Sequence, residues 1–289
     1  MRNTTCLFVS DLHGHIERYQ KLFNTIEQEQ PYALFMGGDL LPSGILNFSS
    51  AKRAYRDFIE DVLYKGLTRL QKLLGEHYPN VFLILGNDDG RFEEATIVDL
   101  AAQGIWHYAH NRCLKLGAFH VFGYAYVPPT PFALKDWERY DVSRFVDPGC
   151  SSPKEGIYSV PVSEDEKHWT TMRDDLEKLT NHRSLEKAIF LFHSPPYHTN
   201  LDRADLDGKM FDAAPLDVHV GSIAIRRFIE TRQPYITLHG HVHESARITG
   251  SWKDRIGSTY CFSAAHDGKE LALVRFDLKV PENATRELI

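Results

Sequence analysis

Residue types that bind divalent metal ions follow the short apolar runs of this 289-residue chain. Asp-Leu-His-Gly follows residues 5–10, Gly-Gly-Asp follows 33–36 and Gly-Asn-Asp-Asp follows 81–85. His-Ser-Pro-Pro follows 188–192, and Gly-His-Val-His comes one residue after 235–238. The candidate ligands are Asp11, His13, Asp39, Asn87, His193, His241 and His243. Mixed carboxylate and imidazole ligands suit Mn²⁺, Fe or Zn²⁺ rather than Ca²⁺.

The apolar runs are predicted to be buried strands, because they are short and rich in Val, Ile, Leu and Phe. Helices are predicted at 16–30, 51–74, 92–103, 164–180 and 223–231, where apolar residues recur near the helical period. A further strand is predicted within 115–124, a closing antiparallel set at 247–248, 259–262 and 271–276, and a loose tail at 281–289. Alternation of strands and helices indicates an α/β fold. Because ligands bind at the carboxyl ends of strands in such sheets, the candidate ligands are expected to meet there.

Composition excludes several classes of protein. Hydrophobic residues make up 43% and charged residues 25% of the chain, which is typical of a globular protein and not of a disordered chain or fibre. The net charge of −6 argues against stable, charge-driven nucleic-acid binding. The four cysteines are dispersed, and the first residues do not resemble a signal peptide, so we predict a cytoplasmic protein. The sequence has no long apolar stretch, so we do not expect it to span a membrane. The length favours a single domain over 1–289.

The segment 127–163 differs from the rest of the chain. It is rich in proline and poor in apolar runs, and we predict an irregular excursion. The excursion either shapes a specificity pocket or only covers a sheet edge. Aromatic residues in and beside it could stack on a base or form a small core of their own. They are Tyr124, Tyr126, Phe132, Trp137 and Tyr140.

The ordered motifs D-x-H, G-D, G-N-x-D, H and G-H-x-H resemble the calcineurin-like metallophosphoesterase superfamily, from Asp11 to His243. The resemblance implies a four-layered α/β/β/α sandwich with mixed sheets and two divalent metal ions, with Mn²⁺ favoured over Fe or Zn²⁺. It implies a first ion bound by Asp11, His13 and His243, a second bound by Asn87, His193 and His241, and Asp39 bridging both. A hydroxide bridging the ions would then attack phosphorus in line with the leaving oxygen.

The sequence departs from the family motif G-N-H-[DE], which reads Gly86-Asn87-Asp88-Asp89 here. In the family the His steadies the transition state or protonates the leaving group. A solvated aspartate, with a pKa of about 3.9, is a poor acid at neutral pH. Asp88 could still act if Asp89 raises its pKa. The substrate could instead have a leaving group that needs little protonation, such as a nucleotide or a phosphate anhydride. Alternatively, another histidine could serve, and the candidates are His15, His198 and His266.

These observations predict a dinuclear-metal phosphoesterase that acts on small phosphate esters, with phosphodiesters favoured and nucleotides among the candidates. Asp39 and Asp88 are the candidate catalytic residues. Arg91 is a candidate phosphate clamp, or a surface arginine at a helix start. Tyr197 and His198 are candidate substrate contacts, or parts of a structural loop. The alternative functions are a phosphomonoesterase, a phosphoanhydride hydrolase, and a non-catalytic binding or scaffold protein on the same fold.

Overall fold

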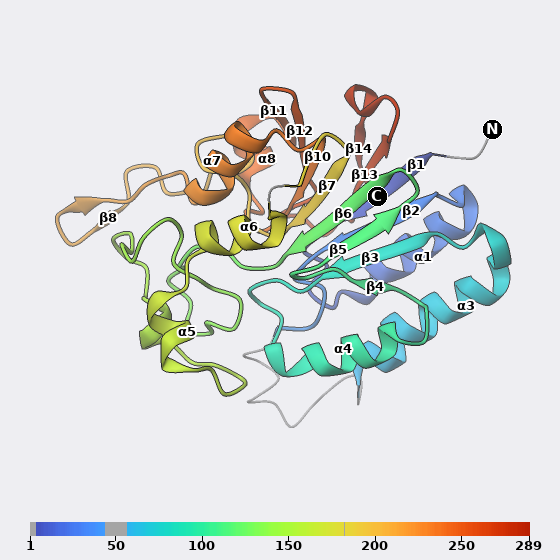
Figure 1. The fold of residues 1–289 in the computed structure, drawn as a ribbon, viewed down its shortest axis with the longest axis horizontal. Helices are drawn as coiled ribbons and strands as arrows, with labels where there is room; N and C mark the ends of the chain where they lie inside the picture. The colour runs from blue at the N-terminus through green and yellow to red at the C-terminus, as the bar shows by residue number, and fades with distance from the viewer. Residues whose placement is uncertain (1–3, 44–56, 182) are drawn as a thin grey trace.

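Two six-stranded sheets stand at the centre of the protein in a computed structural model that describes residues 4–43, 57–181 and 183–289 (Figure 1). The first sheet has the strand order β14-β13-β1-β2-β3-β4, and the second has the order β11-β12-β10-β7-β6-β5. Strands β2 and β3 of the first sheet contact strands β6 and β7 of the second. The two sheets therefore share one hydrophobic core.

Parallel strands form the middle of both sheets. In the first sheet β1 (Thr5–Val9), β2 (Ala33–Gly37), β3 (Asn80–Ile84) and β4 (His107–Tyr108) are parallel. Strand β13 (Ala272–Asp277) pairs with β1 in the antiparallel direction, and β14 (Thr285–Leu288) pairs with β13 in the antiparallel direction. In the second sheet β6 (Phe119–Tyr124), β7 (Ala188–Phe192), β10 (Ile236–His239) and β12 (Thr259–Ser263) are parallel, with β5 (Cys113–Leu116) and β11 (Lys253–Ile256) antiparallel at its edges. Because the central strands are parallel, their carboxyl ends emerge on one side of each sheet.

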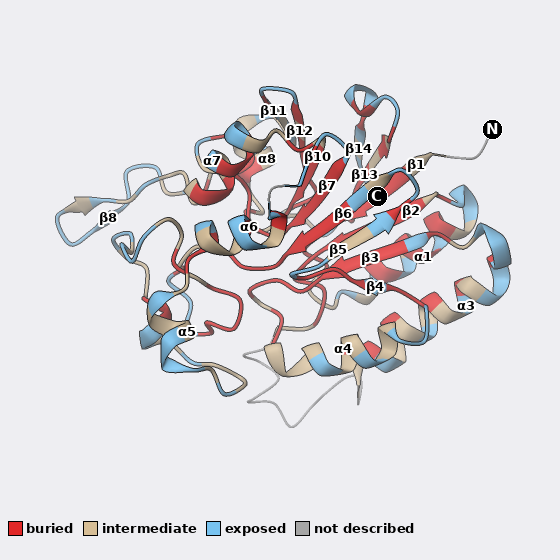
Figure 2. Ribbon diagram, in the orientation of Figure 1, coloured by how far each residue is buried: buried red, intermediate tan, exposed pale blue. Residues whose placement is uncertain are grey.

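Helices cover the outer side of each sheet. Beside the first sheet lie α1 (Ile16–Glu29), the π-helix η1 (Ile59–Tyr64), α3 (Lys65–Leu74) and α4 (Glu94–Ala101), and beside the second lie α6 (Met172–Thr180) and α7 (Ile223–Arg232). The buried positions of α1 recur at helical spacing, at Tyr19, Leu22, Phe23 and Ile26. Figure 2 shows the central strands and the inward helix faces buried, whereas the outward helix faces and edge strands such as β5 are partly exposed. The predicted α/β fold with mixed sheets is confirmed.

The remaining elements are short. They are η2 (Gly75–His77), η3 (Arg91–Glu93), η4 (Pro153–Glu155), α5 (Glu164–Trp169), the hairpin of β8 (Met210–Phe211) and β9 (Ala214–Pro215), α8 (Ser245–Thr249) and η5 (Pro281–Asn283). The β8–β9 hairpin projects from one end of the molecule (Figure 1). Within the part of the chain that the structure describes, no helix has the length and apolar character needed to cross a bilayer.

Most predicted helices are present. The predictions at 16–30, 92–103 and 223–231 correspond to α1, to η3 followed by α4, and to α7. The described part of the predicted helix 51–74 holds η1, α3 and their flanks, whereas residues 51–56 lie outside the described residues. The single helix predicted over 164–180 is wrong. Thr170 is extended (φ −79°, ψ 137°) and ends α5, and the Thr171 side chain then caps α6 by accepting from the backbone of Asp174.

The predicted closing set of antiparallel strands is wrong in two respects. Residues 247–248 lie in the helix α8, which ends at Gly250 in the left-handed conformation (φ 73°). Residues 259–262 and 271–276 do form strands, but β12 belongs to the second sheet and β13 to the first. Local pattern identifies a strand, whereas the choice between two sheets depends on contacts distant in sequence.

Two further predictions are corrected. The single strand expected within 115–124 is a hairpin of β5 and β6, since Gly117 has a positive φ of 57° and reverses the chain. The tail expected to be loose, 281–289, forms η5 and the edge strand β14, in which Leu288 pairs with Ala272. The edge strand is short and largely exposed, so its sequence carries only a weak strand signal.

Candidate metal centre

The predicted ligands lie in the loops that follow five strands, drawn from both sheets. Asp11 and His13 follow β1, Asp39 follows β2, Asn87 follows β3, His193 follows β7, and His241 and His243 follow β10. Five of them, His13, Asp39, Asn87, His241 and His243, line one cavity of about 530 Å³. Asp11 and His193 are fully buried and contact members of this set. The structure thus brings all the predicted ligands to one place, as strand-end positions in parallel sheets should.

The first group of donor atoms surrounds His243. Its Nε2 lies 3.2 Å from Asp11 Oδ1 and 3.2 Å from His13 Nε2. His13 Nε2 lies 3.9 Å from Asp39 Oδ2. Donor atoms of Asp11, His13, Asp39 and His243 all lie within 4.8 Å of one another. Two carboxylates and two imidazoles this close form a donor set that suits a transition-metal ion.

The second group surrounds His193. Its Nε2 lies 3.0 Å from Asn87 Oδ1 and 3.3 Å from Asp39 Oδ2. Its Nδ1 lies 2.8 Å from the backbone oxygen of Gly37, an acceptor that fixes the proton on Nδ1 and leaves Nε2 free to bind. The His241 ring lies 5.2 Å from the His193 ring, centre to centre. Asp39 therefore lies between the two groups and faces a histidine of each.

Backbone geometry around the ligands is strained. Four of them have left-handed φ values, namely Asp11 (57°), His13 (47°), Asp39 (50°) and His241 (74°). Such values are uncommon for residues other than glycine and persist only where the surrounding structure imposes them. Their concentration at one site indicates a functional constraint on the loops.

Glycines beside the ligands are required for space. A Cβ on Gly38 would lie 2.7 Å from His193 Nδ1, and a Cβ on Gly240 would lie 2.7 Å from Asp11 Oδ2. A Cβ on Gly86 would contact the Asp39 carboxylate. Only glycine lets these backbones approach the ligand side chains so closely. The donor set and this cradle together fit bound metal ions.

Electrostatics concentrates negative charge at the site. Burial opposes ionisation of Asp39, yet the charge of His193 lowers its pKa to about 2. Burial likewise opposes ionisation of Asp11, but a hydrogen bond from His243 and the neighbouring imidazoles hold its pKa well below the usual range. Against the effect of burial, Asp39 raises the pKa of His193 to about 9. The buried, ionised carboxylates are therefore stabilised by nearby positive charge, which protons on the imidazoles or metal ions can supply.

His241 differs from these histidines, because burial and the nearby His193 lower its pKa to about 3. Its imidazole is therefore neutral at physiological pH. A neutral imidazole is the form that binds a metal ion.

Asp88, which occupies the place of the family histidine, contacts the first group. Its Oδ2 lies 3.2 Å from His13 Nδ1, its Oδ1 accepts from Ser43 Oγ at 2.7 Å, and its N–H donates to Asp39 Oδ1 at 2.8 Å. Asp89 instead accepts from the backbone N–H groups of Leu40, Leu41 and Gly86. Burial, together with Asp39, raises the pKa of Asp89 to about 7. Its carboxylate thus joins the loops after β2 and β3.

Two contacts around the ligand loops were not predicted. Ser43 holds Asp88, and Arg18 donates from Nη1 to the backbone oxygen of Asp11 and from Nη2 to that of Gly268, both at 2.6 Å. Arg18 is buried in α1, near the start of the helix after the Asp-Leu-His motif. That nearness is the only signal the sequence offers for Arg18, and for Ser43 the only signal is its position four residues after Asp39.

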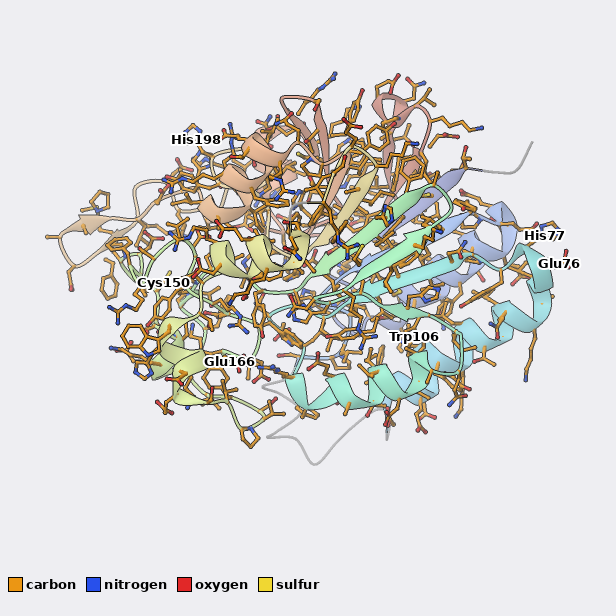
Figure 3. All side chains as sticks on the ribbon, viewed as in Figure 1. Glu76, His77, Trp106, Cys150, Glu166 and His198 are labelled. Carbon is orange, nitrogen blue, oxygen red and sulfur yellow. The ribbon has the colours of Figure 1, made fainter. Side chains whose placement is uncertain are left out.

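The predicted substrate contacts lie elsewhere. Arg91 lines a separate cavity of about 820 Å³, where it pairs with Glu166 at 3.2 Å and with Glu94 at 3.6 Å. His198 is exposed, with its ring 4.5 Å from that of His219. Figure 3 shows His198 at the outside near α7 and Glu166 near α5. Neither side chain therefore lines the cavity of the predicted ligands in this structure, and their contact with substrate stays a prediction.

The other candidate acids, and the candidate substrate contact Tyr197, also lie outside the lining of the cavity. His15 is exposed at the start of α1, and His266 pairs with Glu270 at 3.1 Å. Tyr197 donates to Asp217. None of these three lines the cavity of the predicted ligands.

The irregular segment 127–163 supplies much of the cavity wall. Residues 128–132 and Leu134 line the cavity, together with Cys150. Trp137 and Tyr126 are buried against His110, so they form a small core. The excursion thus borders the predicted ligands and does more than cover a sheet edge.

Comparisons with known proteins give one family match, one matching relative and several matching structures. A profile of the calcineurin-like phosphoesterase family matches residues 4–245. The uncharacterized protein MJ1162 of Methanocaldococcus jannaschii is 40% identical over 92 residues, which are 31% of this chain and 36% of that protein. One solved structure matches with a TM-score of 0.59 and 17% identity, and TT1561 of Thermus thermophilus matches with 0.55 and 16%, each over 99% of both chains. At these identities the structures show the shared fold.

Proposed function

The chain belongs to the calcineurin-like phosphoesterase family, and on this premise we propose that it is a dinuclear-metal hydrolase that prefers phosphodiesters. Members of the family depend on metal ions and act on small phosphate esters. The observation that carries the proposal is the position of Asp39, whose Oδ2 lies 3.3 Å from His193 Nε2 and 3.9 Å from His13 Nε2. One carboxylate between two donor groups is the arrangement that a pair of ions requires.

In this proposal two groups of side chains hold the ions. Asp11, His13 and His243 would hold the first ion, Asn87, His193 and His241 would hold the second, and Asp39 would contribute to both. Imidazole, carboxylate and amide donors favour Mn²⁺, with Fe or Zn²⁺ as the alternatives. Divalent ions in such a site lower the pKa of bound water and neutralise charge on phosphoryl oxygens.

We assign Asp88 a positioning role in place of the acid role expected from its place in the motif. Its Oδ2 faces His13 Nδ1 at 3.2 Å, so the carboxylate accepts the Nδ1 proton and leaves Nε2 for the metal. Ser43 donates to its other oxygen and fixes the carboxylate. Asp88 therefore acts through His13.

The same arrangement of side chains leads us to expect a preference for substrates with a stable leaving group. Among the described residues of the cavity, every histidine belongs to the proposed ligand sets. A ligand imidazole cannot also protonate a leaving group. Esters of acidic alcohols, whose oxygen leaves without prior protonation, should therefore react fastest.

Hydrolysis of bis-p-nitrophenyl phosphate, compared with p-nitrophenyl phosphate, tests the proposal. Metal-stripped protein is reloaded with Mn²⁺, and its metal content is measured in parallel. We expect two ions per chain, a preference for the diester, and a loss of at least roughly 100-fold in kcat/KM in Asp39→Asn. Asp99→Asn, an exposed change in α4, is the matched control. Full turnover in Asp39→Asn would refute the proposal, and two bound ions without turnover would favour the binding or scaffold alternative.

A further inference from the structure

Apart from the proposed ligands, the cavity wall is mainly apolar. Its apolar residues include Pro129, Pro131, Phe132, Leu134, Leu206 and Val220. Phe132 keeps 56% of its surface exposed and is the largest apolar side chain among the described residues of the wall. An aromatic side chain open to a cavity loses that exposure when an apolar group binds against it.

The polar atoms of Thr130, which also lines the cavity, are already engaged. Its hydroxyl donates to Glu138 and accepts from the N–H of Phe132, and its own N–H donates to Glu138 at 2.8 Å. Its backbone oxygen accepts from Lys135 Nζ at 2.7 Å. Thr130 therefore offers no free hydrogen-bonding group to a sugar or a base, which would lose bonds to water on entering.

The charge of the wall also limits the substrate. No lysine or arginine lines the cavity within the described ranges, 4–43, 57–181 and 183–289. Glu244 adds a carboxylate to the lining. Phosphate charge can be neutralised at the proposed metal centre, but a second phosphate against this wall would meet no cation. The cavity therefore accommodates the charge of one phosphate group.

Buried ionic contacts hold the wall in place. Lys135 and Glu138 have fully buried side chains that pair at 2.6 Å behind Thr130. Asp136 accepts from the backbone N–H groups of Arg91 and Ser159. A wall fixed in this way is formed before the substrate arrives, which favours binding of a matching apolar group.

We propose that the natural substrate contains one phosphate group, esterified with an apolar alkyl or aryl group, and that Phe132 is the main side chain that receives this apolar group. The phosphate lies at the proposed metal centre, and the apolar group lies against residues 128–134, Leu206 and Val220. This inference rests on the proposed phosphoesterase function and narrows its substrate class away from nucleotides and phosphate anhydrides.

Three p-nitrophenyl phosphate diesters test the proposal, with methyl, hexyl or 5′-thymidyl as the second ester group. All three have the same leaving group and the same charge. We expect the kcat/KM of the hexyl ester to exceed that of the other two by at least about tenfold, mainly through KM. In Phe132→Ser the ratio of hexyl to methyl should fall at least about fivefold. Phe145→Ser, at a side chain that is 70% exposed and outside the cavity, is the matched control and should keep the ratio.

Binding of hexylphosphonate and methylphosphonate to Mn²⁺-loaded protein separates this proposal from the proposed function. Tighter binding of hexylphosphonate by at least about tenfold, lost in Phe132→Ser, supports the apolar wall even if no ester is hydrolysed. A preference for the thymidyl or methyl ester would overturn the proposal. So would an equal effect of Phe132→Ser on all three esters, or equal binding of the two phosphonates.

Discussion

Replacing Lys135 by Met tests whether a buried ion pair shapes the cavity wall. The Lys135 and Glu138 side chains are fully buried and pair at 2.6 Å. The ammonium also donates to the backbone oxygen of Thr130. Methionine has a similar length and removes the charge, so Glu138 would keep its bonds from Thr130 but lose its cation. Removing one partner of a buried pair typically destabilises a protein by about 3–5 kcal/mol.

The pH dependence of this loss can be worked out from Glu138. Burial raises its pKa from 4.5 to about 7, although Lys135 and Thr130 act to lower it. At roughly 1.4 kcal/mol per pH unit, that difference corresponds to about 3 kcal/mol between the neutral and ionised carboxyl. Without Lys135 the folded-state pKa rises further. Because the folded pKa lies above the unfolded one, the associated stability is present below pH 4.5 and is lost as pH rises through and beyond 7.

Relative to the wild type, Lys135→Met should therefore lose up to about 1.4 kcal/mol more stability near pH 8 than near pH 5, because the two proteins differ only in the ionisation of Glu138 above its wild-type folded pKa of about 7. Urea denaturation of both proteins in EDTA measures the difference, and titration of the metal ligands cancels between them. Lys135→Met combined with Glu138→Gln removes the titrating group and should abolish the extra loss at high pH. An equal loss at pH 5 and pH 8, or a double variant with the same pH slope, would refute the reasoning.

Three further changes test the site and its surroundings. Asp88→Asn should weaken Mn²⁺ binding by about 10–100-fold in calorimetric titration, because His13 loses the carboxylate that orients it; unchanged affinity would contradict the positioning role. Gly240→Ala should lower metal content and turnover together, since its Cβ would lie 2.7 Å from Asp11 Oδ2; normal loading would show that the loop can relax. Burial and nearby arginines lower the pKa of His110 from 6.5 to about 3, so stability is lost as pH falls between these values. Between pH 4.5 and 6.5, the free energy of unfolding of His110→Asn should change with pH less steeply than that of the wild type, by up to roughly 1.4 kcal/mol per pH unit. An unchanged slope would show that His110 does not cause this pH dependence.

The ligand positions could be predicted because each directly follows, or nearly follows, a buried strand. Apolar runs such as 81–85 identify strands from local sequence, and the rule that ligands gather at carboxyl ends then places Asn87 near Asp39 without further information. The prediction does not depend on knowing which sheet a strand joins. That is why the structure places His193 beside Asp39 and His241 beside His193, as the rule predicts, although the sheet assignment of β12 and β13 was wrong.

Arg91 and His198 show where such prediction stops. Both follow predicted ligands closely in sequence, yet a side chain several residues beyond a strand can leave in any direction. Glu166, distant in sequence, holds Arg91 in the other cavity, and the His198 backbone is held by Asp202. The burial of Lys135 depends likewise on the packing of the whole excursion. No periodic pattern marks a lysine as buried when its partner lies in an irregular segment.

The division between strand-end ligands and an irregular wall has a consequence for specificity. Asp11, Asp39 and His193 are held by loops anchored in the shared core, where steric limits at Gly38 and Gly240 leave little room for change. Phe132, in contrast, belongs to an excursion whose shape depends on its own buried contacts, centred on Glu138. Changes in the wall can therefore alter the accepted ester group without disturbing the donor atoms, as is common where a rigid scaffold carries variable loops. By the same reasoning, a variant of the wall that loses the preference for the hexyl ester should retain its full metal content. The reason is that no described residue of the wall segment 128–134 contacts a proposed ligand through a hydrogen bond or an ion pair.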